Sequence, residues 1–154
     1  MIFFFWLFAL LVVYTYLGYP VLLNFAADMR RISAVEKSEI TPLLSVVVPA
    51  YNEEASIAAK LENVLSLDYP KAHLEIVVVS DCSSDRTDEI VRSFLDRGVR
   101  LHRMEKRGGK IAGYKAVLPS LTGKIVVFSD ATSRLALDSL RKLARNFADE
   151  SVGC

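Results

Sequence analysis

The stretch LLSVVVPAYNEEAS, residues 43–56, passes within a few positions from an apolar run to a cluster of polar side chains. Its first half, with three consecutive valines, is typical of a strand that is covered on both faces. After Pro49, the residues Asn52, Glu53 and Glu54 predict the cap and first turn of a helix. The stretch therefore predicts a buried strand whose carboxyl end carries polar groups into the start of a helix.

Strands and helices of this kind alternate along the rest of the chain. Apolar runs rich in β-branched residues predict strands at 43–49, 74–80 and 123–129, with a weaker one at 99–104. Helical patterns follow these runs at 53–66, 86–97, 110–121 and 136–149. This order is typical of parallel βαβ units with right-handed crossovers, and it predicts an α/β fold with a doubly wound sheet.

The carboxyl ends of the predicted strands gather most of the chemically useful side chains. In doubly wound sheets, ligands bind beyond these ends. Here the ends carry residues 49–54, 81–85, 106–110 and 130–132. We therefore expect several carboxylates and a basic, glycine-containing loop to meet at one edge of the sheet.

Two common phosphate-binding signatures are absent from the sequence. Neither GxGxxG nor GxxxxGK[ST] occurs, because Met104 stands where the second signature needs glycine and Ile111 follows Lys110. A phosphate at the first predicted helix would also face Glu53 and Glu54. The pattern argues against a nucleotide-dependent dehydrogenase and against a P-loop enzyme.

The carboxylates and the basic loop fit a nucleoside diphosphate better than they fit the phosphate sites of those two enzyme classes. Glu53 and Asp81 could accept hydrogen bonds from ribose hydroxyls or a base N–H, and the basic loop around residues 108–109 could neutralise a diphosphate. Asp130 could hold Mg²⁺ or Mn²⁺ that bridges diphosphate oxygens. Each feature also has a structural interpretation, as a cap or turn for the acids and as a solvated surface loop for the basic residues.

Residues 1–25 contain no charged side chain and predict a membrane span. As a helix they would extend roughly 37 Å, against about 30 Å for the hydrocarbon core of a bilayer. Because no basic residue precedes this run and no AxA site follows it, we expect a retained anchor in the cell membrane rather than a cleaved signal peptide. Arg30, Arg31 and Lys37 follow in a polar connector at 26–42, and the positive-inside rule then puts the globular part in the cytoplasm.

Net charge and cysteine content argue against nucleic acid as a partner and against zinc or disulfides as structural elements. The net charge of +1 argues against nucleic acid, whose phosphate backbone usually selects a marked basic excess. The two cysteines, Cys82 and Cys154, have no CxxC spacing, so the sequence predicts neither a zinc site nor a disulfide framework.

Four blocks of the sequence, VVVPAYNEEASI, EIVVVSDCSSDRT, GGKIAGYKAVL and GKIVVFSDATS, resemble in order and spacing the membrane-anchored family 2 glycosyltransferases with a GT-A fold. The resemblance covers residues 43–154. It implies the N-terminal part of a GT-A domain, with an incomplete Rossmann-like sheet. The apolar start, with GYPVLL at its end, also looks like theirs.

The resemblance implies roles for particular residues. The uridine of a UDP-sugar would be held by Pro49, Ala50, Tyr51, Glu53 and Asp81. Lys110 of the Gly-Gly-Lys block would lie near the diphosphate. The DxD metal motif reads Asp130-Ala131-Thr132, so Asp130 would bind Mg²⁺ or Mn²⁺ while Thr132 replaces the second acid. Cys82 and Arg86 stand where small residues are usual.

The expected function is inverting transfer of a sugar from a UDP-sugar, or another nucleotide sugar, to a saccharide or lipid-linked acceptor. In the resembling enzymes the catalytic base and the acceptor-binding motif lie well beyond the DxD block, so this chain is expected to be an N-terminal fragment that holds the donor-binding half. The alternative is a non-catalytic, membrane-tethered module that binds a nucleotide sugar, should the chain be complete.

Overall fold

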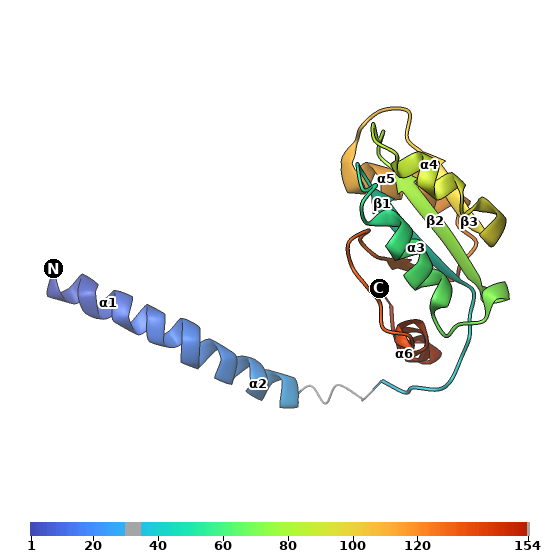
Figure 1. Cartoon of the computed structure of the whole chain (residues 1–154). Coiled ribbons are helices and arrows are strands. Elements are labelled where there is room, and N and C mark those ends of the chain that lie inside the picture. Colours follow the sequence, from blue (N-terminus) through green and yellow to red (C-terminus); the bar gives the residue numbers. More distant parts are fainter. Residues whose placement is uncertain (30–34, 154) are drawn as a thin grey trace. The chain divides into compact units, whose positions relative to one another are not determined.

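The computed structural model describes residues 1–29 and 35–153, which form two compact units, Met1–Val35 and Glu36–Cys154 (Figure 1). The predicted connector at 26–42 thus lies partly outside the described residues, and so do Arg30 and Arg31. Each unit is considered by itself.

The first unit is one long apolar helix. It consists of α1 (Ile2–Val13), a π turn at Tyr14–Gly18 and α2 (Tyr19–Met29), so it extends into the predicted connector. Helix Ile2–Ala27 contains an 18-residue window with a mean hydropathy of 2.0 and is long and apolar enough to cross a membrane. The π turn ends two residues before Pro20, whose ring would clash with a carbonyl of the preceding turn in a regular α-helix.

The second unit is built on a four-stranded parallel sheet, which confirms the predicted α/β class. Its strands are β1 (Leu44–Ala50), β2 (Leu74–Ser80), β3 (Val99–Arg103) and β4 (Ile125–Phe128). Their order is β3-β2-β1-β4, so the chain first builds outward from β1 on one side and then returns to the other. The strand order therefore reverses at β1.

An α-helix follows each strand. These helices are α3 (Ile57–Ser66), α4 (Thr87–Arg92), α5 (Gly109–Val117) and α6 (Ser139–Ala144), with short 3₁₀ turns at Lys71–His73, Leu95–Arg97, Leu118–Ser120 and Arg145–Ala148. All four predicted helices are present, but each α-helix is shorter than its pattern.

The start of α3 differs from the prediction. Asn52 does not cap a helix that begins at residue 53; it has a left-handed backbone conformation with φ of 54°. Helix α3 begins four residues later, after Ser56. The side chain of Asn52 instead accepts a hydrogen bond from the backbone N–H of Ser84, 32 residues away in sequence.

The two faces of the sheet have separate cores, as the continuous valine runs predict. Val46 and Val78 belong to the face that packs with α3, α4 and α6. Val47 and Val77 lie on the opposite face and pack with Val117 of α5. Figure 1 shows α3 and α4 along one side of the sheet and α5 behind it. This arrangement leaves the carboxyl ends of the strands free for polar loops.

Candidate functional site

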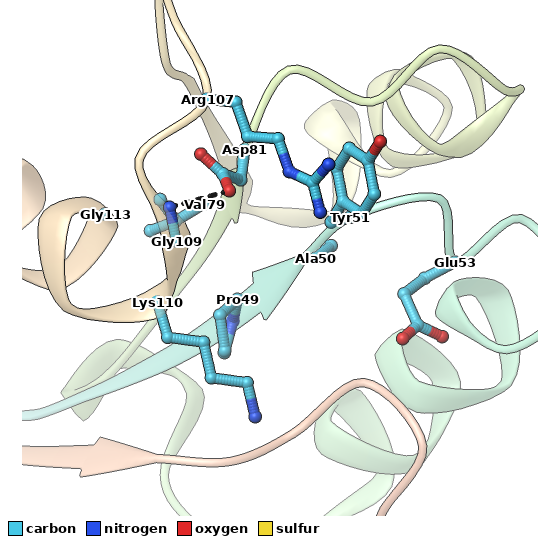
Figure 2. A pocket seen from close by; sticks show the side chains of 10 residues that line it. All are labelled: Pro49, Ala50, Tyr51, Glu53, Val79, Asp81, Arg107, Gly109, Lys110 and Gly113. Atoms are coloured by element: carbon cyan, nitrogen blue, oxygen red, sulfur yellow. Dashed lines mark hydrogen bonds between the residues drawn. The ribbon is translucent and has the colours of Figure 1, made fainter.

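A cleft of about 230 Å³ lies at the carboxyl ends of β1 and β2 (Figure 2). Its lining residues are Pro49, Ala50, Tyr51, Glu53, Val79, Asp81, Arg107, Gly109, Lys110 and Gly113. The cleft is smaller than the roughly 300–1,000 Å³ of sites for drug-sized ligands, so it has room for only a part of a nucleotide sugar. It lies at β1, where the strand order reverses and where doubly wound sheets bind their ligands.

Six of the seven predicted site residues line this cleft: Pro49, Ala50, Tyr51, Glu53, Asp81 and Lys110. The seventh, Asp130, follows β4 and is not among the lining residues. Its carboxylate forms an ion pair with Lys110, with 2.6 Å between Nζ and Oδ1. The structure therefore brings together residues from four loops that are up to 81 positions apart in sequence.

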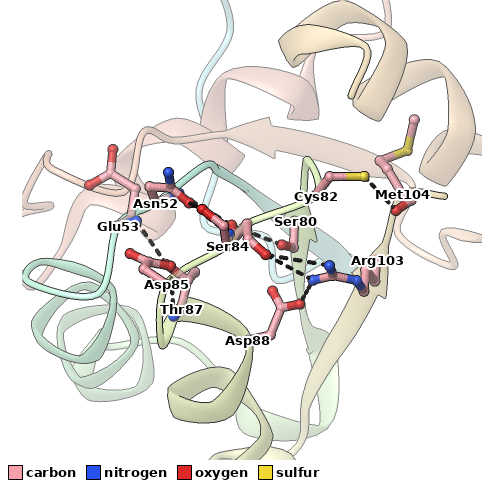
Figure 3. Close-up of polar contacts among 11 residues, drawn as sticks. Asn52, Glu53, Ser80, Cys82, Ser84, Asp85, Thr87, Asp88, Arg103 and Met104 are labelled. Carbon is pink, nitrogen blue, oxygen red and sulfur yellow. Dashed lines mark hydrogen bonds and ion pairs between the residues drawn. The ribbon is translucent and has the colours of Figure 1, made fainter. Parts of the chain in front are cut away.

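The loops after β1 and β2 are braced against each other (Figure 3). The backbone N–H of Glu53 donates to the Thr87 hydroxyl at 2.8 Å. Glu54 and the loop after β2 bond reciprocally, because the Glu54 N–H donates to Asp85 while its carboxylate accepts from the Arg86 N–H, both at 3.0 Å. Glu54 and Asp85 thus have structural roles, and Glu53 alone of the two glutamates lines the cleft.

Asp81 holds the basic loop in place. Its two carboxylate oxygens accept hydrogen bonds from the backbone N–H groups of Gly108 and Gly109, at 2.7 and 2.9 Å. Gly109 has a φ of 77°, a conformation that favours glycine. A carboxylate has about four lone-pair sites, so Asp81 retains acceptor capacity for a ligand. The sequence did not indicate this contact, because its partners lie 27 and 28 residues away.

Arg103 and Arg107 are close in sequence, but their side chains make contacts in different places. Arg107 lies over the ring of Tyr51, with its guanidinium carbon 3.9 Å from the ring centroid (Figure 2). Such a cation–π contact is attractive. Arg103 turns away, and its guanidinium binds Asp88 and the carbonyl of Ser83 (Figure 3). Of these two arginines, only Arg107 lines the cleft.

Lys110 and Asp130 form the polar rim of the site. Both side chains are more than half exposed. The hydrogen bond with Asp130 raises the pKa of Lys110 above its usual value, so the lysine stays charged over the physiological range. Within residues 1–29 and 35–153, no three acidic, histidine or cysteine side chains cluster in a way that could hold a metal ion. In the segment 130–132, Asp130 supplies the one carboxylate, because residue 132 is threonine.

Gly113 allows α5 to approach the sheet closely. A Cβ atom at this position would lie 2.9 Å from Cγ1 of Val79 on β2. A larger residue would push the helix, and with it Lys110, away from the cleft. Sequence reasoning missed this residue, although its place four positions after Gly109 was a usable signal.

Cys82 has a strained backbone for a residue with a side chain, because its φ is 59°. Its thiol donates to the carbonyl of Met104 at 3.1 Å (Figure 3). We expect Cys82→Gly to change the free energy of unfolding by less than about 1 kcal/mol, since relief of strain offsets the lost weak bond and the greater entropy of glycine. Thermal unfolding measures this change. Cys82→Val, which introduces a β-branched side chain at this left-handed position, should destabilise clearly; equal stability of both variants would contradict the interpretation.

Comparison with known families and proteins gives a consistent result. The sequence model described as glycosyl transferase family 2 matches residues 45–154. The β-monoglucosyldiacylglycerol synthase of Trichormus variabilis is 34% identical over 116 residues, which cover 73% of this chain and 25% of the synthase. The poly(ribitol-phosphate) β-N-acetylglucosaminyltransferase TarS of Staphylococcus aureus is 33% identical over 69% of this chain and 19% of TarS. The chain thus spans a quarter or less of the length of these relatives.

Solved structures with the same fold contain nucleotide sugars. The mannosyltransferase PcManGT from Pyrobaculum calidifontis, in complex with GDP-Man and Mn²⁺, is similar with a TM-score of 0.80 and 31% identity, over 94% of this chain and 44% of PcManGT. A structure of S. aureus TarS in complex with UDP-GlcNAc has a TM-score of 0.63 and 33% identity, over 70% of this chain and 31% of that one.

Proposed function

Because the chain belongs to glycosyl transferase family 2 and has a GT-A-like sheet, we propose that it binds the nucleotide-sugar donor of a glycosyltransferase. The enzyme would move a sugar from a UDP-sugar, or another nucleotide sugar, to a hydroxyl of a saccharide or lipid-linked acceptor. The transfer would invert the configuration at the anomeric carbon. One observation supports this proposal most strongly: Glu53, Asp81 and the basic loop share a cleft whose rim is the Lys110–Asp130 pair.

The nucleoside would occupy the cleft itself. Tyr51 offers an aromatic face on which a base can stack, and the Arg107 guanidinium covers that face. The base would therefore displace Arg107 or slide beneath it. Pro49 and Ala50 would form the apolar floor, while Glu53 and Asp81 would accept hydrogen bonds from ribose hydroxyls or a base N–H.

The diphosphate would lie towards the rim. Its negative charge would draw the Lys110 ammonium away from Asp130 and leave that carboxylate free for a divalent cation. Mg²⁺ commonly binds one or two carboxylates together with substrate phosphates and waters, so a single Asp130 fits Mg²⁺ or Mn²⁺ when the donor is present. The ion would stabilise the charge on the departing nucleoside diphosphate. Thr132 supplies a hydroxyl in place of the second carboxylate.

This arrangement predicts that metal binding depends on the nucleotide. We expect Mn²⁺ to bind the free protein only weakly, because the one carboxylate at the rim is already paired with a lysine. With UDP or GDP present, the affinity should rise at least about tenfold, since diphosphate oxygens complete the ligand set. Electron paramagnetic resonance of unbound Mn²⁺ measures both values. Tight binding of Mn²⁺ without nucleotide would mean that a different set of ligands holds the ion.

The membrane anchor is part of the proposal. Helix Ile2–Ala27 would span the bilayer at residues 1–25, and residues 26–42 would connect it to a donor-binding domain at 43–154. The basic residues that follow the helix support a cytoplasmic location for that domain. The similarity to PcManGT covers 94% of the chain, more than the matched family region alone.

A transfer assay tests the function. The complete protein, purified in detergent, would be incubated with a panel of UDP- and GDP-sugars and with saccharide or lipid acceptors. Release of UDP or GDP is expected for one donor, and NMR of the product would give the anomeric configuration. Nucleotide binding without transfer to any acceptor would favour the non-catalytic module, and absence of both would refute the proposal.

A further inference from the structure

A lysine is buried beneath the turn that carries Asp130. Lys60 of α3 is 1% exposed and is the largest fully buried side chain in the described residues. Its ammonium donates hydrogen bonds to the Ser129 hydroxyl at 2.6 Å and to the carbonyl and hydroxyl of Ser133 at 3.0 and 3.1 Å. These serines flank Asp130 on both sides, so Lys60 holds the two ends of the turn.

Burial of the Lys60 ammonium costs free energy, which suggests that its charge has a function. Transfer of an ammonium from water into a protein interior is unfavourable, and an apolar side chain of similar volume is often as stable or more so. In the part of the chain that the structure describes, Lys60 contacts only neutral oxygens and forms no ion pair with a carboxylate. Burial lowers the pKa of Lys60 below its usual value, and the negative charge of Asp130 partly opposes that shift.

Asn63, a neutral residue of α3, shows that the chain segment after Asp130 can be attached to this helix without a charge. One turn after Lys60, the amide of Asn63 donates to the carbonyl of Leu135 at 2.9 Å and accepts from its N–H at 2.8 Å. Asn63 thus fixes the continuation of the same segment with no charge. The positive charge at Lys60 is therefore not needed merely to attach the segment to α3.

We propose that Lys60 is a positioning residue for the donor diphosphate, a buried cation that fixes the Asp130 turn and offsets the negative charge which Asp130 presents to the phosphates. The inference rests on the proposed donor binding. Helix α3, which follows the Tyr51 loop, would thereby also support the Asp130 turn. Lys110 neutralises Asp130 from the solvent side, and Lys60 does so from below.

The variant Lys60→Met tests this role, because methionine fills similar space without charge. The fold should persist, since Ser129 and Ser133 lie 3.1 Å apart and can bond each other. We expect UDP binding, measured by calorimetry on the complete chain in detergent, to weaken about tenfold in EDTA and only about threefold with Mn²⁺, because a bound ion also offsets the charge of Asp130. Circular dichroism would verify the fold.

Two further variants separate charge from packing. Asn63→Ala loosens the same segment without changing its charge, so its loss of affinity should be equal in EDTA and Mn²⁺. In an Asp130→Ala background, Lys60→Met should weaken UDP binding equally in EDTA and in Mn²⁺, because no carboxylate remains at the turn to hold an ion. If Lys60→Met weakened binding equally in both conditions while Asp130 is present, the inference would be wrong.

The outcomes also distinguish this inference from the proposed function. A wild-type chain that binds neither UDP nor GDP would refute donor binding and the role of Lys60 together. A wild-type chain that binds UDP, with unchanged affinity in Lys60→Met, would overturn the role of Lys60 alone.

Discussion

Replacement of Asp81 by alanine is expected to weaken UDP binding about 100-fold, with Mn²⁺ and with EDTA alike. The carboxylate holds the N–H groups of Gly108 and Gly109, and in the proposed complex it would also accept a hydrogen bond from the nucleoside. Hydrogen bonds to charged groups contribute about 1.5–3 kcal/mol each, so loss of the one to the nucleoside accounts for the roughly 2.7 kcal/mol of a 100-fold change. Because Asp81 is not part of the proposed metal site at Asp130, the loss should not depend on the ion.

The control for this variant is Asp96→Ala. Asp96 is an exposed acid on a 3₁₀ turn beyond α4, so its removal changes the net charge equally and should leave UDP affinity unchanged. Hydrogen exchange of the loop at 104–109 would show whether Asp81→Ala also releases the basic loop. Unchanged UDP affinity in Asp81→Ala would remove this residue from the proposed site, and a loss seen only with Mn²⁺ would place it at the ion instead.

Replacement of Asp130 by alanine should abolish the metal-dependent part of donor binding and spare the rest. For the wild-type chain we expect Mn²⁺ to tighten UDP binding by about tenfold, or roughly 1.4 kcal/mol. In the variant, Lys110 no longer has its partner and stays available to the diphosphate. UDP affinity should then be the same in Mn²⁺ and EDTA, and at or above the wild-type value in EDTA, because the carboxylate that faces the phosphates is gone. Calorimetric titrations in both conditions measure the difference.

Thr132→Asp is the complementary variant. It places a second carboxylate two residues after Asp130 and restores the DxD pattern, so it should strengthen the dependence of UDP binding on Mn²⁺. Persistence of the full Mn²⁺ effect in Asp130→Ala would show that the ion, if bound, uses other residues. Asp130 would then remain only as the ion-pair partner of Lys110.

Much of the sheet could be predicted because the residues of each strand indicate whether its faces are buried. The valine runs of β1 and β2 leave no polar face, which indicates strands covered on both sides, and both strands lie within a residue of their predicted bounds. The start of α3 could not be predicted in this way. Asn52 and Glu54 have the sequence of a helix start, but the loop after β2 competes for their polar groups.

Lys60 illustrates a signal that the sequence contained but that was not used. It stands in the pattern of Ile57, Lys60, Leu61 and Val64, the spacing of a helix face that packs on a core. A lysine at such a position implies a buried charge with partners elsewhere. Its partners, 69 and 73 residues further on, are visible only in the folded chain.

The sequence by itself determined which segments become strands, that polar residues follow them, and which family the chain resembles, because these properties depend on the order of residues along one segment. Tertiary structure alone decided that Asp81 holds the glycine loop, that Arg107 covers Tyr51, that Asp130 pairs with Lys110 and that Lys60 bonds Ser129. Each of these contacts joins residues 20 or more positions apart. Their distances depend on how the strands align and how closely the helices pack, which no local pattern specifies.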